Sequence, residues 1–408
     1  MTNSRRTAAF VMARWLLTKG FPANLLPAGV DRAFVQDLVY TAIRRMRALR
    51  RVLGELVKKW PKGELEALLY IGAAQILYMP GVPDFAAVNE TVEAAKACGN
   101  PNVAKVVNGV LRNLLRRRDE FETLLASAPV EERESFPTEL VRRWTKRFGA
   151  ANAERLAVWH NAPAETYLAR KDGSFVTLER GKSVTDAPGY REGEFIVQDP
   201  GTRLAVELVD PRPDDTVLDA CAAPGGKTIQ LAWRGAKVTA CEVNPKRRAR
   251  LAANLARVRL ADSVKVLDDF PETAFAKVLV DAPCSNTGVL RRRPDARWNW
   301  STEKLAALVK LQAEILDRAA ALVAPGGALV YSTCSNESEE NDGQVAEFLR
   351  RHPGFTLAET RESLPFESGT DGAFAARLVR RSEAGSDGVI PGPDPFMKTE
   401  EAKPSVSV

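Results

Sequence analysis

The chain has 408 residues, which corresponds to two or three domains of ordinary size. Apolar residues make up 45% and charged residues 27%, so a buried core can form and wholesale disorder is excluded. The net charge of +6 is uneven, because residues 1–120 carry 19 basic and 10 acidic side chains while the remainder carries 39 and 42. The positive first third therefore predicts a polyanionic partner that binds there.

Cysteine and histidine usage excludes several classes of site. With only His160 and His352, neither histidine catalysis nor a metal is expected. The apolar run 67–80 is too short to span a bilayer, so we expect no membrane association. The five cysteines form no C-x-x-C pair, which argues against a disulfide framework and favours the reduced cytoplasm; they are Cys98, Cys221, Cys241, Cys284 and Cys334.

Helical periodicity runs through the first third of the chain. Apolar residues recur at steps of about four from 5 to 122, and Pro61 and the segment 80–83 interrupt them as turns. The pattern predicts an all-helical domain of six or seven helices over residues 1–125. We expect Arg116–Arg118 to end the last helix, where cations suit the helix dipole.

The middle and last parts of the chain differ from the helical first third. Over 126–200 the sequence predicts a connector, with a short helix opening at Pro137 and carrying Trp144, and short strands or turns over 164–200. Beyond it, β-rich runs alternate with helical stretches, which predicts a doubly wound parallel α/β sheet over 201–381. The runs are Thr216–Asp219, Lys237–Glu242, Val264–Leu267, Ala276–Asp281 and Ala328–Ser332. The tail 382–408 is rich in Gly, Pro, Ser and Glu and is expected to be disordered.

The segment 217–228 joins a β run to a helix through a loop of small residues. Such a loop allows backbone N–H groups and a helix N-terminus to meet an anionic ligand group. Cys221 stands where an ATP-binding P-loop needs glycine, and the three spaced glycines of a dinucleotide site are absent. Glu242, at the end of the next run, is placed to accept hydrogen bonds from a ribose diol. The alternative interpretation is a tight turn without a ligand.

Two cysteines follow two different β runs. Cys284 comes shortly after Asp281, and Cys334 comes directly after the run that ends at Ser332. Ligands of open parallel sheets bind beyond the carboxyl ends of the strands. A lone cysteine is commonly a small buried hydrophobic residue. Two at the same edge, with Asp281 beside them, favour a chemical role.

These segments carry a resemblance to a known family. Asp281-Ala282-Pro283-Cys284-Ser285 and Ser332-Thr333-Cys334-Ser335, with Gln198-Asp199-Pro200 and Asp371-Gly372-Ala373-Phe374, resemble the RNA 5-methylcytosine methyltransferases, specifically the bacterial 16S ribosomal RNA cytosine methyltransferase B type (Sun/Fmu proteins). Residues 5–120, with Ala73–Tyr78 and Val88–Glu90, are similar to the NusB-type RNA-binding domain.

The resemblance implies a domain organisation. It gives an all-α NusB-like RNA-binding domain over 1–125 and a connector or small RNA-binding subdomain over 126–200. A Rossmann-like S-adenosyl-L-methionine-dependent methyltransferase domain follows over 201–381, and a disordered tail over 382–408.

The resemblance also implies roles for the site residues. Cys334 would attack carbon-6 of cytosine, Cys284 would release the methylated base, and Asp281 would hold or protonate the base at N3. A helix end or a cation such as Lys227 or Arg293 is expected to lower the pKa of the thiol. S-adenosylmethionine would be bound by Cys221, Ala222, Ala223, Pro224, Gly225, Gly226, Lys227, Glu242, Asp268 and Asp281, with Asp269 as the alternative to its neighbour.

RNA is the expected partner, most specifically 16S ribosomal RNA, and the protein is expected to be a cytoplasmic monomer. Arg292 and Arg293 lie in a basic run just after the Cys284 loop, and we expect them to contact phosphate. Two alternatives remain open at this point. One is a transfer RNA cytosine methyltransferase, and the other is a catalytically silent RNA-binding assembly or antitermination factor.

Overall fold

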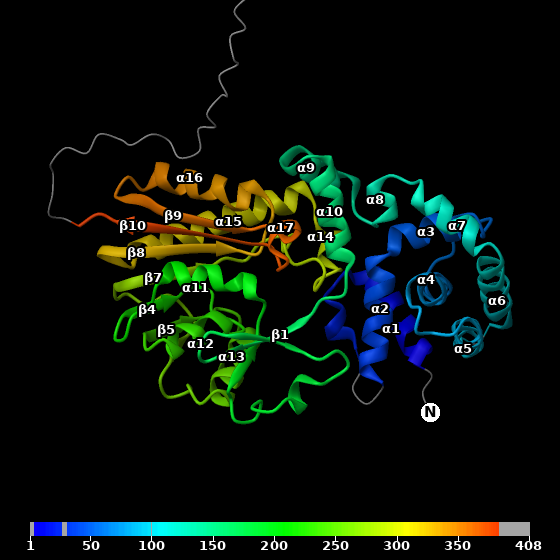
Figure 1. Ribbon diagram of the computed structural model, residues 1–408, viewed down its shortest axis with the longest axis horizontal. Helices are drawn as coiled ribbons and strands as arrows, with labels where there is room; N and C mark the ends of the chain where they lie inside the picture. The colour runs from blue at the N-terminus through cyan, green and yellow to red at the C-terminus, as the bar shows by residue number, and fades with distance from the viewer. Residues whose placement is uncertain (1–3, 27–30, 99, 383–408) are drawn as a thin grey trace, which may run out of the picture.

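The structure is a computed structural model that describes residues 4–26, 31–98 and 100–382 (Figure 1). Apart from Ser382, the expected disordered tail lies outside the described residues. No helix within these three ranges is long and apolar enough to cross a membrane.

Helices alone make up the N-terminal part, as the periodicity predicted. They are α1 (Ser4–Thr18), η1 (Pro22–Leu25), α2 (Arg32–Arg44), α3 (Met46–Gly54), α4 (Glu64–Tyr78), α5 (Asp84–Lys96), α6 (Pro101–Arg116) and α7 (Arg118–Ala126). α4 is the central helix, with an unbroken buried run from Ala67 to Ile76. A Cβ atom at Gly72 would lie 2.4 Å from Leu111 Cδ1, so this glycine permits α4 and α6 to cross closely.

One expectation for this part is wrong. Arg116–Arg118 does not end the last helix, because α6 ends at Arg116 and a further helix, α7, begins at Arg118. The Arg118 guanidinium donates to Asp84 at 2.5 Å and to the carbonyl oxygen of Ile76 at 3.2 Å. This side chain therefore ties α7 to α4 and α5.

The connector consists of three helices and a small antiparallel sheet. The helices are α8 (Val130–Arg133), α9 (Thr138–Phe148) and α10 (Ala150–Asn161), and the sheet has the order β2-β1-β3, from β1 (Thr166–Arg170), β2 (Phe175–Leu178) and β3 (Phe195–Val197). η2 (Val184–Asp186) and η3 (Pro200–Thr202) flank β3. α9 and α10 share a hydrophobic cluster with Leu290, Ala296 and Phe366, so the connector packs against the last part of the chain.

A seven-stranded sheet forms the C-terminal part, with the order β6-β5-β4-β7-β8-β10-β9. Its strands are β4 (Thr216–Asp219), β5 (Lys237–Cys241), β6 (Lys265–Leu267), β7 (Phe275–Asp281), β8 (Val323–Thr333), β9 (Phe355–Ser363) and β10 (Ala373–Arg380). β4 to β8 are mutually parallel, whereas β10 runs antiparallel to β8 and β9. The predicted doubly wound sheet is confirmed, and the antiparallel pair extends it.

Helices cover both faces of this sheet (Figure 1). One face carries α11 (Arg203–Val209), α12 (Gly226–Trp233) and α13 (Pro245–Arg257), and the other carries α15 (Thr302–Ala321) and α16 (Asp342–Arg351). The short elements α14 (Ala296–Asn299), η4 (Ser338–Glu340) and α17 (Pro365–Ser368) lie in the connections. Both faces are therefore buried, which explains why the strands read as apolar runs.

Arg297 is the centre of the junction between the three parts. Its side chain is fully buried and lies 3.8 Å from the centre of the Phe136 ring. The guanidinium donates to four acceptors from two other segments: the carbonyl oxygens of Arg44, Ser135 and His160 and the Oδ1 atom of Asn161. One side chain of the C-terminal part thereby satisfies polar groups of both the N-terminal helices and the connector.

We predict that Arg297→Met lowers the free energy of unfolding by about 3 kcal/mol, because it leaves buried acceptors without donors. Denaturant titration measures this change. Arg318→Met is the matched control, because the Arg318 side chain is 55% exposed and pairs with Asp269 at the surface. Equal stability of the two variants would contradict the central role of Arg297.

Candidate active site

The two predicted cysteines lie side by side. β7 and β8 are adjacent and parallel, and their register pairs Asp281 with Ser332 at the carboxyl ends. Because Cys284 and Cys334 follow these ends by three and two residues, the loops that carry them meet at one edge of the sheet. The two Sγ atoms are 3.2 Å apart. Cys284 is buried, whereas Cys334 is partly exposed.

Asp281 is held by a cation and a hydroxyl group. Lys227 Nζ lies 2.6 Å from Asp281 Oδ2, and Ser332 Oγ donates to Asp281 Oδ1 at 2.8 Å. Burial by itself lowers the pKa of the Lys227 ammonium. The nearby Asp281 and then Cys334 raise it by more than burial lowers it, so the pKa lies above its usual value. Lys227 is therefore a permanent positive charge that faces both the carboxylate and the partly exposed thiol.

The two thiols have different environments. The hydrogen bond with Cys334, burial, and the charges of Cys334 and Glu340 raise the pKa of Cys284 well above its usual value. Cys284 therefore keeps its proton at neutral pH. Of the two cations named from the sequence, Lys227 pairs with Asp281 at the site, whereas Arg293 pairs with Asp295 at 3.1 Å and lies over the Phe21 ring.

The loop after β4 is closely packed at its glycines and has buried acceptors beside it. Gly225 has a φ of 110° and its Cβ would lie 2.8 Å from Leu251 Cδ1, while a Cβ at Gly226 would lie 3.2 Å from Gln198 Nε2. The Oδ1 atom of Asp219 and the Oε1 atom of Gln198 are buried without a hydrogen-bond partner among the described residues. Such unpaired acceptors suit a bound group that carries N–H or O–H donors.

Asp219 is a site residue that the sequence analysis did not assign. Thr228 Oγ1 donates to its Oδ2 at 2.6 Å, so only one carboxylate oxygen remains for a ligand. Burial raises the pKa of Asp219 to about 6, although the Thr228 hydroxyl opposes the rise. The sequence did offer a signal for this residue, since Asp219 is an acidic residue at the end of an apolar strand, just before a glycine loop. A carboxylate buried there requires a polar partner.

Carboxylates also follow the next two strands. Glu242 directly follows β5, is 3% exposed, and accepts through Oε1 from the backbone N–H of Asn244 at 2.8 Å and from Arg247 at 3.0 Å. Asp268 directly follows β6 and is exposed, whereas its neighbour Asp269 pairs with Arg318 at 2.6 Å. The structure thus favours Asp268 over Asp269 as a ligand of a nucleoside at this edge.

The remaining predicted residues of the cofactor group complete the loop after β4. Ala222 donates its backbone N–H to the carbonyl oxygen of Cys241 at 3.0 Å, which fixes the loop to β5. Asn254 donates to the carbonyl oxygen of Pro224 at 2.8 Å, which fixes the loop to α13. The ten predicted cofactor residues all lie at the carboxyl ends of β4, β5, β6 and β7, namely Cys221, Ala222, Ala223, Pro224, Gly225, Gly226, Lys227, Glu242, Asp268 and Asp281.

Arg292, which we expected to contact phosphate, has its guanidinium engaged within the protein. Arg292 donates to Asp199 at 2.8 Å, to Asp371, and to the carbonyl oxygen of Glu165 at 2.7 Å. Its neighbour Arg291 is buried and donates to Asp371 at 2.9 Å. Arg293 differs, because it pairs with the nearby Asp295 and its side chain is 36% exposed. Arg291 and Arg292 therefore form an internal clamp between distant segments.

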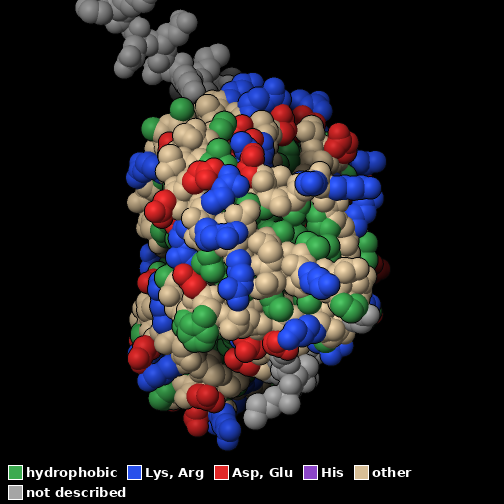
Figure 2. All heavy atoms as spheres, turned by 90° about the vertical axis from the view of Figure 1, so that its right-hand side faces the viewer, with side chains coloured by type: hydrophobic (Ala, Val, Ile, Leu, Met, Phe, Trp, Pro, Cys, Tyr) green, Lys and Arg blue, Asp and Glu red, His purple; other side chains and the backbone are tan. Residues whose placement is uncertain are grey.

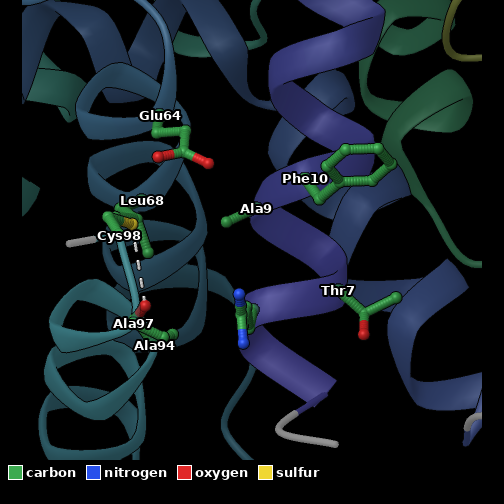
Figure 3. Close-up of a pocket in the computed structure, with 9 residues that line it drawn as sticks. Thr7, Ala9, Phe10, Glu64, Leu68, Ala94, Ala97 and Cys98 are labelled. Atoms are coloured by element: carbon green, nitrogen blue, oxygen red, sulfur yellow. Dashed lines mark hydrogen bonds between the residues drawn. The ribbon is translucent and has the colours of Figure 1, made fainter.

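Two hollows lie away from Cys284 and Cys334. A cavity of about 260 Å³ lies between α1, α4 and the end of α5, where Cys98 Sγ donates to the Ala94 carbonyl oxygen (Figure 3). Burial, together with Glu64, raises the pKa of Cys98 to about 11. A second hollow, of about 340 Å³, lies at the opposite end of the sheet, around Thr216 and Lys237. Over the ranges that the structure describes, no group of three or more His, Cys, Asp or Glu residues is placed to hold a metal ion.

The fold and the site define a Rossmann-like enzyme with a nucleoside-binding edge and a thiol pair beside it. The model of the 16S rRNA methyltransferase RsmB/F family matches residues 206–384, and that of the NusB family matches residues 2–116. The chain belongs to the RsmB/F family of S-adenosylmethionine-dependent RNA methyltransferases.

Similar proteins support this membership over almost the full length. Ribosomal RNA small subunit methyltransferase B of Erwinia tasmaniensis is 33% identical over 93% of this chain and 99% of its own. The protein of the same name from Cronobacter sakazakii is 34% identical over 86% of this chain and 91% of its own. A methyltransferase homolog from Pyrococcus horikoshii shares the fold, with a TM-score of 0.55 and 21% identity over 63% of this chain and 99% of its own.

We predict that Glu242→Ala weakens binding of S-adenosylmethionine by about one to two decades, since losing a charged acceptor costs roughly 1.5–3 kcal/mol. Asp268→Ala is expected to weaken it in the same direction. Isothermal titration calorimetry measures both affinities. Asp269→Ala is the control. A larger loss of affinity in Asp269→Ala than in Asp268→Ala would reverse the choice between these two residues.

Proposed function

We propose that the protein transfers a methyl group from S-adenosylmethionine to carbon-5 of a cytosine in 16S ribosomal RNA, through a covalent cysteine–cytosine adduct. The observation that carries the proposal is the pair of thiols 3.2 Å apart, beside Asp281 and next to the nucleoside-binding edge. The names of the curated relatives support ribosomal RNA as the substrate. A silent RNA-binding factor would have no need of this arrangement.

The cofactor supplies an electrophilic methyl group on a sulfonium ion. The residues that fit it are the loop 221–227, Glu242 and Asp268, together with the unpaired acceptors on Asp219 and Gln198. These residues would hold the cofactor at the ends of β4, β5 and β6, next to β7, whose loop carries Cys284. Lys227 belongs both to the cofactor loop, where it follows the two glycines, and to the thiol site, where it pairs with Asp281.

The proposed roles of the thiols follow from their exposure. Carbon-5 of cytosine is a poor nucleophile, and a thiolate that adds at carbon-6 makes it electron-rich. Cys334 is partly exposed and faces the Lys227 ammonium, which suits the attacking thiolate. Asp281 holds the base at N3 as the bond forms. The target base must leave its stack to reach this edge.

Release of the product requires a base and a leaving group. The proton on carbon-5 must be removed before the bond between carbon-6 and Cys334 Sγ breaks and returns its electron pair to sulfur. We assign the proton removal to Cys284, which lies 3.2 Å from Cys334. Once Cys334 is bonded to carbon-6, it no longer raises the pKa of Cys284 through its hydrogen bond and its charge. Cys284 then loses its own proton to solvent, and the resulting thiolate accepts the proton from carbon-5.

The N-terminal helices offer a basic face for RNA. Lys105, Arg112 and Arg116 are exposed on α6 at spacings of seven and four, which places them on one side of the helix. α6 contains no acidic residue. Figure 2 views the molecule from this side and shows Lys and Arg side chains over much of the face, between hydrophobic patches. We assign phosphate contacts to this face, because the Arg292 guanidinium is engaged within the protein.

The two cysteine variants are expected to fail at different steps. Cys334→Ala should lose turnover and form no covalent adduct, because the attacking sulfur is gone. Cys284→Ala should attack and methylate, then stall with RNA attached. A denaturing gel of labelled RNA incubated with S-adenosylmethionine shows the adduct as a slowly migrating band.

The other outcomes of this experiment are equally informative. A band from Cys334→Ala and none from Cys284→Ala would exchange the two roles. No band from either variant, with only modest losses of stability, would mean that both cysteines are structural. Bisulfite mapping of ribosomal and transfer RNA in cells without the protein identifies the substrate, and a lost site in transfer RNA alone would overturn the choice of 16S ribosomal RNA.

The basic face predicts a change in salt dependence. Replacing Lys105, Arg112 and Arg116 together by alanine should weaken RNA binding and make its logarithmic salt slope shallower by about two to three, roughly one per lost phosphate contact. Binding titrations at several salt concentrations measure the slope. The control removes the same charge from exposed positions of α15 and α16, by Lys304→Ala, Lys310→Ala and Arg350→Ala. Equal slopes for the two triple variants would refute the assignment.

A further inference from the structure

One buried carboxylate contacts both cysteine loops. Glu340, the last residue of η4, is 0% exposed. It accepts through Oε1 from the backbone N–H of Ser285 at 2.9 Å, and through Oε2 from the hydroxyl groups of Ser285 and Ser335. Ser285 directly follows Cys284, and Ser335 directly follows Cys334. The carboxylate thus cross-links the residues adjacent to the two thiols.

Neighbouring polar groups hold Glu340 in this place. Gln312 of α15 donates through Nε2 to Glu340 Oε1 at 3.0 Å and to the carbonyl oxygen of Pro283 at 2.9 Å. The Tyr331 hydroxyl lies 3.1 Å from Gln312 Oε1 and donates to the Glu340 carbonyl oxygen at 2.6 Å. Gln312 and Tyr331 are both 0% exposed. This network connects Glu340 to β8, to α15 and to the residue that precedes Cys284.

We propose that Glu340 is a positioning residue that fixes the two cysteine loops and thereby sets the distance between the two thiols. The inference rests on the proposed roles of Cys284 and Cys334. Taking a carboxylate out of water is costly, so a buried one persists where donors surround it. Here the donors come mainly from the two loops that carry the reacting sulfur atoms. A residue that only filled space would need neither the charge nor these partners.

The charge of Glu340 also acts on Cys284. Four groups face this part of the site: Cys334, Glu340, the Tyr331 hydroxyl, and the Lys227–Asp281 pair at the end of β7. Glu340 contributes to raising the pKa of Cys284, after the hydrogen bond with Cys334, burial, and the charge of Cys334. Removing the negative charge should therefore lower the pKa of Cys284.

Two substitutions separate the charge from the geometry. Glu340→Gln keeps the size and removes the charge, whereas Glu340→Asp keeps the charge and withdraws it from the serines. The first measurement is the rate of alkylation of each cysteine by iodoacetamide against pH, resolved by mass spectrometry of the peptides. The second is kcat and KM for methylation of a ribosomal RNA fragment. Glu339→Gln is the matched control, because Glu339 is exposed and pairs with Arg143 at the surface.

We expect Glu340→Gln to move the alkylation midpoint of Cys284 to lower pH and to reduce kcat by at least about tenfold, with KM changed less than about threefold. Glu340→Asp should keep the midpoint near that of the unmodified protein and still reduce kcat. Glu339→Gln should leave both measurements unchanged. Unchanged alkylation and unchanged kcat in Glu340→Gln would overturn the proposal.

Failure of this inference differs from failure of the proposed function. If the unmodified protein transfers no methyl group to RNA and Cys284→Ala forms no adduct, the proposed function fails, whereas the alkylation profile still reports the link between Glu340 and Cys284. If Glu340→Gln does not fold, Ser285→Ala, Ser335→Ala and the double variant replace it. Because both serines bind the same carboxylate, we expect the losses in kcat caused by Ser285→Ala and by Ser335→Ala not to add up in the double variant. Strict additivity would overturn the proposal.

Discussion

Two arginines and two aspartates form a buried ion cluster on which the rest of the structure depends. Arg291 and Arg292 share Asp371, which precedes β10, and Arg292 also binds Asp199 at the end of the connector. Both aspartate side chains are 4–5% exposed. Removing one member would leave an uncompensated charge in the interior, which is strongly destabilising. The cluster therefore holds the connector, the segment after Cys284 and the last strands in one arrangement.

The Cys284 loop is thus fixed at both ends. Glu340 binds it at Ser285, and the ion cluster binds it at Arg291 and Arg292. Between these points a Cβ at Gly288 would lie 2.7 Å from the Gly372 carbonyl oxygen and 2.9 Å from that of Cys334, so the backbones touch. A pre-organised loop of this kind keeps the two sulfur atoms adjacent without a substrate, and the cost of ordering them is met during folding.

The local patterns of the sequence predicted the parallel core and the edge at which the chemistry lies. Apolar runs mark β4 to β8, and a shared edge follows from their parallel direction, so Cys284 and Cys334 could be placed together. Partners distant in sequence could not be deduced in this way. Arg292 was expected to contact phosphate, and its internal partners could not be foreseen because Asp199 lies 93 residues before it and Asp371 79 residues after it. Glu340 lies in a polar segment whose burial depends on α15 and β8 together.

The same segment that carries the thiol loop also carries the junction between domains. Within a few residues of Arg292, Arg297 donates to the carbonyl oxygen of Arg44 and Trp298 to that of Ile43, both in α2. The N-terminal helices therefore have a fixed position relative to the loop that holds Cys284. An RNA bound on those helices, as we propose, would meet the thiols at a set distance and orientation, and the reaction of its cytosine would be effectively intramolecular. Docking of the helices and alignment of the thiols are consequently two effects of one short stretch of chain.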